Sequence, residues 1–382
     1  MRAPACSRGS APGHWHGLRW QLDSSAQQRL ELLDEYLYVD AECLAHPNAS
    51  ANFDRFPGTT RPCARSRPEL LQRLANASIL MVGDSTAART MMHLCQTVLH
   101  GRSHGFINAS NHNASVAQFS PYWRRTKWAG ANDFCRIPLD GRATELSPSY
   151  EVDARSLSSG ATLSIGHFAH YGAVGPPYWA QAYPMPPWLG HTTLQQVEED
   201  LPEFCAVARC GVPTLIVVSS ALWDASVWWQ RANFSLGFEF NATDVAEYTQ
   251  AVGRLIRALR RRFPPPRTVV VWRTIHPSFK EHRGISPRSM EILNHAVRKR
   301  AKHEWRVGLA DVGAMMAQRP VQPFIPTSVK GSLNSRFASG TSDGTHLHPW
   351  LEIPVTNLLL NLLWDAIRNR TCESAAVSAS MD

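Results

Sequence analysis

Short runs rich in β-branched residues alternate with long amphipathic segments over most of this 382-residue chain. The alternation is typical of a parallel sheet covered by helices, because each crossover between parallel strands needs a long connection. The five expected strands are Ser78–Gly83, Ala161–Phe168, Thr214–Ser220, Thr268–Thr274 and Arg306–Val312. The expected helices are Ser66–Ala75, Thr86–His100, Leu194–Ala208, Asp244–Phe263, Pro287–His303 and Trp350–Arg368. The pattern predicts an α/β fold, a three-layer α/β/α sandwich around a five-stranded parallel sheet.

Outside these segments the chain divides into an arm, two insertions and a tail. Residues 1–65 lack the alternation and are rich in Pro, Cys and turn-forming residues, so we expect an N-terminal arm held to the domain by cysteines. Residues 66–370 hold the α/β domain, with long insertions at 101–160 and 169–192, and residues 371–382 read as a flexible tail. Insertions of this length usually carry function or are flexible, and these two contain too many aromatic residues to be simply flexible.

A candidate nucleophile follows the first expected strand. The apolar run that ends at Gly83 is followed by Asp84, Ser85 and a helical segment. This order places the Ser85 hydroxyl at the carboxyl edge of the sheet and at a helix N-terminus, where free N–H groups and the helix dipole stabilise negative charge. A turn between strand and helix is one way of presenting a nucleophilic serine. The tripeptide alone is weak evidence.

A candidate acid–base pair precedes the last expected helix. Asp343 and His346 are three residues apart, so both can face one cleft, where the carboxylate orients the imidazole and the imidazole takes the serine proton. His348 competes with His346 for this role or lines the cleft. A metal site among His346, His348, His167 and His170 is another hypothesis, but the spacing to a third ligand is not evident.

Together these motifs resemble the SGNH/GDSL hydrolase superfamily, a group of α/β enzymes with a flavodoxin-like sheet. The chain is similar in particular to the PC-esterase branch, which includes the trichome-birefringence-like polysaccharide O-acetyltransferases and the luminal domain of the sialic-acid O-acetyltransferase. The likeness spans residues 78–365. It is carried by Gly83-Asp84-Ser85 with Arg89, Ile165-Gly166-His167-Phe168, Ala221-Leu222-Trp223-Asp224, Trp272-Arg273-Thr274-Ile275-His276-Pro277 and the Asp343/His346 pair.

The resemblance implies a role for each matching residue. Ser85 would attack an acyl carbonyl, His346 would act as base and then acid, and Asp343 would orient it. The backbone N–H groups of Ser85 and Gly166 would form part of the oxyanion hole. The superfamily usually has an oxyanion Asn where this chain reads Leu222-Trp223-Asp224, so that donor is absent. Arg89, one helical turn after Ser85, is the candidate replacement, with a salt bridge as the alternative. Trp223, Asp224 and Arg273 complete the expected oxyanion and substrate group. No cofactor or metal is expected.

Asparagine and cysteine usage indicates a secretory origin. Seven of the fourteen Asn residues open a glycosylation sequon, namely Asn48, Asn76, Asn108, Asn113, Asn233, Asn241 and Asn369. About two would be expected by chance. Eight Cys without a CxxC pair fit disulfides better than zinc. We therefore expect a Golgi-luminal or extracellular domain, although no signal peptide or transmembrane segment is visible in this chain.

Positive charge and tryptophan are both abundant. The net charge of +8 is concentrated in Arg254–Arg267 and Arg298–Lys302. A solvated helix surface explains both runs, and an anionic glycan or acidic membrane surface is the alternative. Nucleic acid is not expected, because no recognition motif accompanies the charge. The thirteen Trp residues suit either core packing or stacking on sugars.

The resemblance to the PC-esterase branch favours an O-acetyltransferase that acts on glycan hydroxyls through an acyl-Ser85 intermediate. An O-acetylesterase is the alternative within enzymes, because water can resolve the same intermediate. A catalytically silent glycan-binding module with the same fold is the alternative from another class. The expected partners are a glycan or polysaccharide acceptor and an acyl donor. Whether a membrane-bound partner delivers the acyl group, and what the oligomeric state is, are left open.

Overall fold

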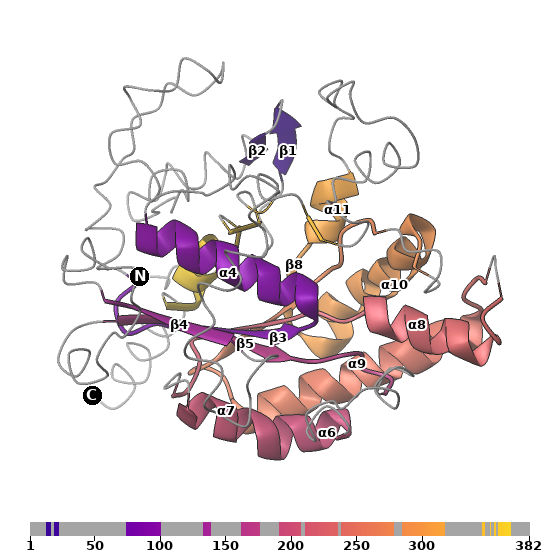
Figure 1. Ribbon diagram of the computed structural model, residues 1–382, viewed down its shortest axis with the longest axis horizontal. Helices are drawn as coiled ribbons and strands as arrows, with labels where there is room; N and C mark the ends of the chain where they lie inside the picture. The colour runs from indigo at the N-terminus through magenta and orange to yellow at the C-terminus, as the bar shows by residue number, and fades with distance from the viewer. Residues whose placement is uncertain are drawn as a thin grey trace, which may run out of the picture.

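A mixed six-stranded sheet with helices on both faces forms the body of the molecule in the computed structural model (Figure 1). The structure describes residues 13–16, 19–22, 74–100, 133–138, 162–175, 191–207, 211–235, 238–278, 285–317, 346–347, 352, 355–356 and 358–367. The strands are β3 (Ser78–Gly83), β4 (Asp133–Pro138), β5 (Thr162–Ala169), β6 (Leu215–Val218), β7 (Val269–Arg273) and β8 (Gly308–Ala310).

The predicted five-stranded parallel sheet is confirmed. Its order is β5-β3-β6-β7-β8, so the first strand in sequence lies between the second and the third. After β3 the chain adds β5 on one side of β3, and it then adds β6, β7 and β8 on the other side. Ligands of open α/β sheets bind at such a reversal, beyond the carboxyl ends of the strands. Ser85 follows β3, directly at this point.

A sixth strand extends the sheet in a way that the sequence pattern did not predict. β4 pairs antiparallel with β5, from Asp133 opposite His167 to Pro138 opposite Thr162. It comes from the insertion expected at 101–160, so that insertion contributes an edge strand. A short antiparallel hairpin, β1 (Gly13–His16) with β2 (Arg19–Leu22), is the described part of the expected N-terminal arm.

Helices cover both faces of the sheet. One face carries α6 (Thr193–Gln195), η8 (Gln196–Asp200) and α7 (Leu201–Val207), which follow one another without a break, together with α8 (Leu222–Arg231), α9 (Ala242–Arg262), α10 (Pro287–Arg300) and η10 (Ala301–Trp305). The other carries α4 (Ser85–His100), α11 (Val312–Ala317) and the helical residues 358–367. Helix α8 was not predicted. Of the helix expected at Ser66–Ala75, residues 66–73 lie outside the described part and residues 74–75 lie in a turn.

Two apolar cores result from the alternation of side chains along the buried strands. Leu80 and Val82 face α7–α10, whereas Ile79 and Met81 face α4 and the C-terminal helix. Strands buried on both faces read as continuous apolar runs, which is why the sequence located β3 at its observed bounds.

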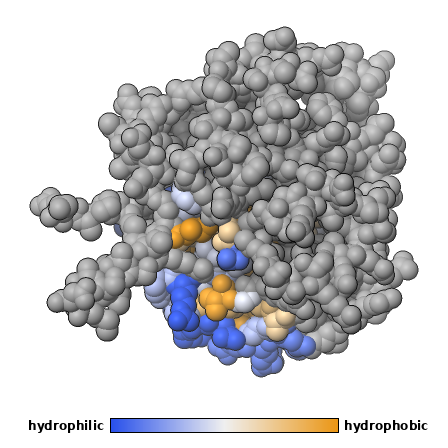
Figure 2. All heavy atoms as spheres, turned by 90° about the vertical axis from the view of Figure 1, so that its left-hand side faces the viewer, coloured by the Kyte–Doolittle hydropathy of each residue, from blue (hydrophilic) through white to orange (hydrophobic). Residues whose placement is uncertain are grey.

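The described surface is mainly polar. Figure 2 views the molecule from the left-hand side of Figure 1 and shows hydrophilic residues with few hydrophobic ones between them. Only Leu194, Val212 and Phe234 are large apolar side chains classed as exposed among the described residues. Within the same residues, no helix has the length and apolar content needed to cross a membrane.

Candidate active site

Ser85 is held at the start of α4 by the residue before it. The Asp84 carbonyl accepts the first helical hydrogen bond, from the Ala88 N–H at 3.1 Å. The buried Asp84 carboxylate accepts from the Thr86 N–H at 2.9 Å and from the Thr86 hydroxyl at 2.7 Å. Asp84 is thus the N-cap of α4, and Ser85 is the first helical residue, whose own N–H has no partner within the helix. The sequence marked Asp84 only as part of a motif.

Gly83 is required by the close approach of the neighbouring strand end. A Cβ at this position would overlap the Ser219 hydroxyl and lie 2.8 Å from Ala87 Cβ. The Gly83 carbonyl accepts from the His170 N–H at 2.8 Å and from His167 Nε2 at 2.9 Å. These contacts fix the turn between β3 and α4 against the loop that follows β5.

His346 reaches Ser85 from the far end of the chain. His346 Nε2 lies 2.8 Å from Ser85 Oγ, and both residues are half-buried. With the proton on Nδ1, Nε2 accepts the serine hydroxyl proton, which is the geometry of a nucleophile and its base. Asp343 and the competitor His348 lie outside the described residues. The structure therefore brings together two of the predicted catalytic residues.

Asp224 orders the loop after β5. Its fully buried carboxylate accepts from the Val174 N–H at 2.9 Å and from the Ser220 hydroxyl, and that hydroxyl in turn accepts from the Ala173 N–H at 3.1 Å. Burial raises the pKa of Asp224 to about 6, against the lowering effect of these hydrogen bonds. Asp224 therefore positions a loop and is not itself exposed to a substrate.

Gly172 gives this loop its shape. Its φ of +96° lies in the region that favours glycine, and a Cβ would lie 3.2 Å from the Asp224 carboxylate oxygen Oδ1. The loop begins at His170, whose N–H is bound to Gly83, so it lies beside the turn that carries Ser85. Sequence reasoning missed Gly172, since no periodic signal marks a loop glycine.

The structure does not bring Gly166 to Ser85. It lies within β5 opposite Leu80 of β3 on one side and Phe134 of β4 on the other, three residues before the strand ends. A Cβ there would lie 3.3 Å from the Phe204 ring, so close packing of a helix accounts for this glycine. A role of its N–H in an oxyanion hole does not fit this position.

Arg273, expected near the substrate, is fully buried at the end of β7. Its guanidinium donates to the hydroxyls of Thr86 at 3.4 Å and Thr90 at 3.3 Å, both on α4. Burial lowers its pKa, and the nearby charges of Glu352 and Asp84 counteract this. Arg273 therefore lies beneath the first two turns of α4, away from solvent.

Arg89 and Trp223 occupy half-buried positions near the turn. Arg89 lies one helical turn after Ser85. Burial raises the pKa of Glu352 to about 7, and Arg89 is among the charges that counteract this rise. The Trp223 ring packs edge-on against Tyr171 with centroids 5.6 Å apart. Of the predicted substrate residues, these two remain partly accessible.

The two histidines of β5 and its loop are hydrogen-bonded within the fold. His167 Nε2 donates to the Gly83 carbonyl, and His170 Nδ1 donates to Gln196 Oε1 at 2.9 Å. Burial lowers the pKa of His170, which favours the neutral ring. No three His, Cys, Asp or Glu side chains within the described ranges are grouped as metal ligands.

Fold and site together define a doubly wound α/β protein with a serine–histidine pair at the carboxyl edge of its sheet. No family model matches the chain, and no curated protein matches it. Among solved structures, the chain is similar to a protein from Parabacteroides merdae that is provisionally described as a GDSL-like lipase. The identity is 11% and the TM-score 0.34, over 77% of this chain and 97% of that one. So low a score carries no argument about function, and the fold assignment rests on the strand order.

Proposed function

We propose that this protein is a serine-dependent acyl-ester enzyme of the SGNH type. The observation that carries the proposal is the 2.8 Å contact between His346 Nε2 and Ser85 Oγ at a helix N-terminus beyond the sheet. A serine becomes a useful nucleophile only beside a base that takes its proton. Asp343 is proposed to orient His346, on the strength of its spacing alone.

The proposed cycle has two steps. Ser85 Oγ attacks the carbonyl carbon of an ester, its proton passes to His346 Nε2, and the alcohol leaves with that proton, so that an acyl ester of Ser85 remains. An incoming hydroxyl then gives its proton to His346 and attacks the acyl carbon, and Ser85 recovers a proton from His346 as it leaves. The negative oxygen of each intermediate needs fixed donors. We assign this role to the N–H groups of Ser85 and Gly172, the latter in place of Gly166.

The acceptor in the second step is proposed to be a sugar hydroxyl, which makes the enzyme a glycan O-acetyltransferase of the Golgi lumen or cell exterior. The resemblance to the PC-esterase branch supports transfer. The half-buried pair Trp223 and Tyr171 supports a sugar ligand, because aromatic faces stack on sugars. Cys95 is disulfide-bonded, which supports an oxidising compartment.

The direct test is hydrolysis of p-nitrophenyl acetate by the full-length protein. Ser85→Ala should lower the rate by several orders of magnitude, because the nucleophile is lost. The control is Ser235→Thr, at an exposed position after α8, which keeps the sequon at Asn233 and should keep the wild-type rate. Equal rates for wild type and Ser85→Ala would refute the proposed chemistry. The reaction is then repeated with glycan acceptors, and the product masses are measured by mass spectrometry. Only transfer yields an acetylated sugar, so this experiment separates transfer from hydrolysis.

A further inference from the structure

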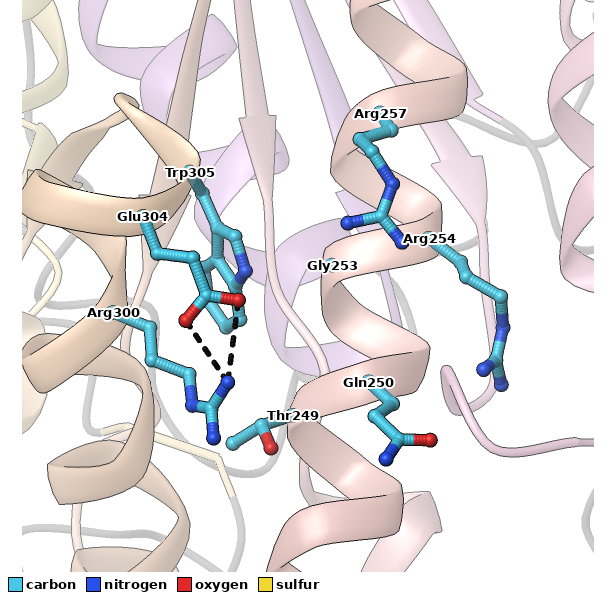
Figure 3. Close-up of a pocket in the computed structure, with 8 residues that line it drawn as sticks. All are labelled: Thr249, Gln250, Gly253, Arg254, Arg257, Arg300, Glu304 and Trp305. Carbon is cyan, nitrogen blue, oxygen red and sulfur yellow. Dashed lines mark hydrogen bonds and ion pairs between the residues drawn. The ribbon is translucent and has the colours of Figure 1, made fainter.

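A second concave site lies between α9 and the segment where α10 passes into η10. It is a cavity of about 300 Å³ whose wall includes Arg254, Arg257, Arg300 and Trp305 (Figure 3). It shares no residue with the candidate active site, and α9 and α10 cover the face of the sheet opposite α4. The two basic runs of the sequence contribute to it together, because Arg254 and Arg257 belong to the first and Arg300 to the second.

The arginines of this cavity differ in how they are paired. Arg300 Nη1 is bound to the Glu304 carboxylate at 2.9 and 3.2 Å. Arg254 and Arg257 make no hydrogen bond or ion pair within the described part of the chain. Several other arginines of the same helices have such partners. Arg260 donates to the Trp305 carbonyl at 2.9 Å, Arg261 pairs with Glu198, and Arg298 pairs with Asp311, whereas Arg262 lies over the Phe263 ring. The cavity therefore carries two guanidinium groups without a hydrogen-bonded partner among the described residues, and the charge of Glu247 acts on one of them, Arg254.

The wall between these cations is shaped by a glycine. Gly253 lies in the interior of the 21-residue helix α9, where glycine destabilises a helix relative to alanine. A Cβ at Gly253 would lie 3.0 Å from Trp305 Nε1 and 3.4 Å from Arg257 Nη1. The missing side chain thus lets the indole edge and the guanidinium approach the helix. Figure 3 shows the indole nitrogen on the side of the ring that faces α9.

Trp305 supplies an unused donor at the same place. The residue is 5% exposed, and no hydrogen-bond acceptor for its Nε1 is found among the described residues. A buried donor without an acceptor destabilises the fold, and a bound acceptor removes this destabilisation. The side chain of Arg257, which lies next to this N–H, is solvent-exposed and can move aside to admit a ligand.

We propose that this cavity binds an oxyanion, a sulfate or phosphate group. Guanidinium groups bind such oxygens in pairs of charge-assisted hydrogen bonds. Arg257 lies beside the Trp305 N–H, which adds a neutral donor, while the exposed side chain of Arg254 points away from Trp305 in Figure 3 and must rotate to contribute. The volume is at the lower limit of ligand-sized cavities, which suits a single ion or one sugar that carries the group. The inference does not depend on the chemistry of Ser85.

Isothermal titration calorimetry on the full-length protein tests this. The probes are sodium sulfate, sodium phosphate and N-acetylglucosamine 6-sulfate, with N-acetylglucosamine as the uncharged blank, at an ionic strength held constant with NaCl. Wild type should bind the oxyanions and not the blank. Tighter binding of the sulfated sugar than of free sulfate identifies a group carried on a glycan, and equal binding identifies a free ion. Ser85→Ala should bind as wild type does, so loss of turnover and loss of this site are separable.

Variants of the cavity complete the test. Arg254→Gln combined with Arg257→Gln should raise the Kd at least about tenfold, because two charge-assisted partners are lost. The control is Arg262→Gln, which removes one positive charge from an exposed position on α9 outside the cavity and should change the Kd less than about twofold. Gly253→Ala keeps all charges but covers the Trp305 N–H, and it should also weaken binding. Absence of oxyanion binding in wild type, or an equal loss in Arg262→Gln, would overturn the proposal.

Discussion

The two residues that precede Ser85, Gly83 and Asp84, determine where its hydroxyl lies. Gly83 lets the end of β6 approach the turn, and Asp84 caps α4 through both the N–H and the hydroxyl of Thr86. The cap fixes Ser85 as the first helical residue, and His346 then lies within hydrogen-bond distance. Nucleophile, helix N-terminus and base thus depend on one short turn.

The choice between the two nearby histidines gives a prediction. His346→Ala should abolish ester turnover, because its Nε2 is the atom beside Ser85 Oγ. His348→Ala should retain a substantial part of the activity, since the three-residue spacing from Asp343 selects His346. Initial rates with p-nitrophenyl acetate decide between them. An inactive His348→Ala beside an active His346→Ala would show that the base has been assigned to the wrong residue.

Asp224 gives a prediction about pH. Its ordinary pKa is 3.8, and burial raises it to about 6 in the folded protein. Between these values the folded state holds a proton that the unfolded state has lost, so stability from this group falls as the pH rises from about 4 to about 6 and is level above that. The shift corresponds to about 3 kcal/mol.

Asp224→Asn removes this titration. The free energy of unfolding in urea, measured for both proteins across this pH range, should show the excess stability of the wild type declining towards pH 6. Glu352 also has a raised pKa, but it is present in both proteins and cancels in the difference. A difference that does not change with pH would mean that the carboxyl titrates normally.

At the scale of secondary-structure elements, a buried polar cluster joins the two segments that carry Ser85 and His346. The Thr90 hydroxyl of α4 donates to Glu352 at 2.9 Å and accepts from Arg273 of β7 at 3.3 Å. Glu352 comes six residues after His346 and is 2% exposed. The cluster therefore ties Glu352 to α4 and β7, and we expect this tie to help hold the imidazole against the serine.

Thr90→Val tests this connection. The valine keeps the shape but removes the Thr90 donor from Glu352 and the acceptor of Arg273 Nη2, so unfolding should require about 1–3 kcal/mol less. Because the separation of Ser85 and His346 changes, kcat should fall while KM changes little. Thr243→Ser, at an exposed position in the first turn of α9, keeps the sequon at Asn241 and should change stability by less than about 0.5 kcal/mol. If Thr90→Val behaves as this control does, the cluster does not position the base.

At the scale of the whole molecule, the sequons predict glycosylation. Of the seven, Asn76, Asn233 and Asn241 are described and are all exposed, so their amides are open to modification. Expressed through a secretory route, the protein should lose apparent mass after enzymatic deglycosylation and should migrate differently with and without reductant. If all eight cysteines of a natively produced sample titrate as free thiols, the secretory assignment is wrong, and the proposed ester chemistry is unaffected.

Cys205 is a free, buried thiol in α7, close in sequence to Cys210.

The sequence by itself determined the layers of the fold. Buried parallel strands leave continuous apolar runs, and amphipathic helices leave a period of 3.6 residues, so β3 and α9 were located to within about two residues. Helix α8 was not predicted, because buried residues occupy most of its positions, including the adjacent Trp228 and Trp229. Its sequence therefore shows no clear helical period of apolar residues. β4 was not predicted, because a single edge strand inside a long insertion lies outside the alternation of strands and helices on which the prediction rested.

Only the tertiary structure decided which residues meet. Ser85 and His346 are 261 residues apart, and their contact depends on how the C-terminal segment packs on α4. Motif spacing identified Arg273 and Asp224 as important but assigned both to the substrate, because a motif gives residue type and order but not the direction of a side chain. Burial and pairing are properties of the packed chain, since they depend on neighbours that the local sequence does not contain.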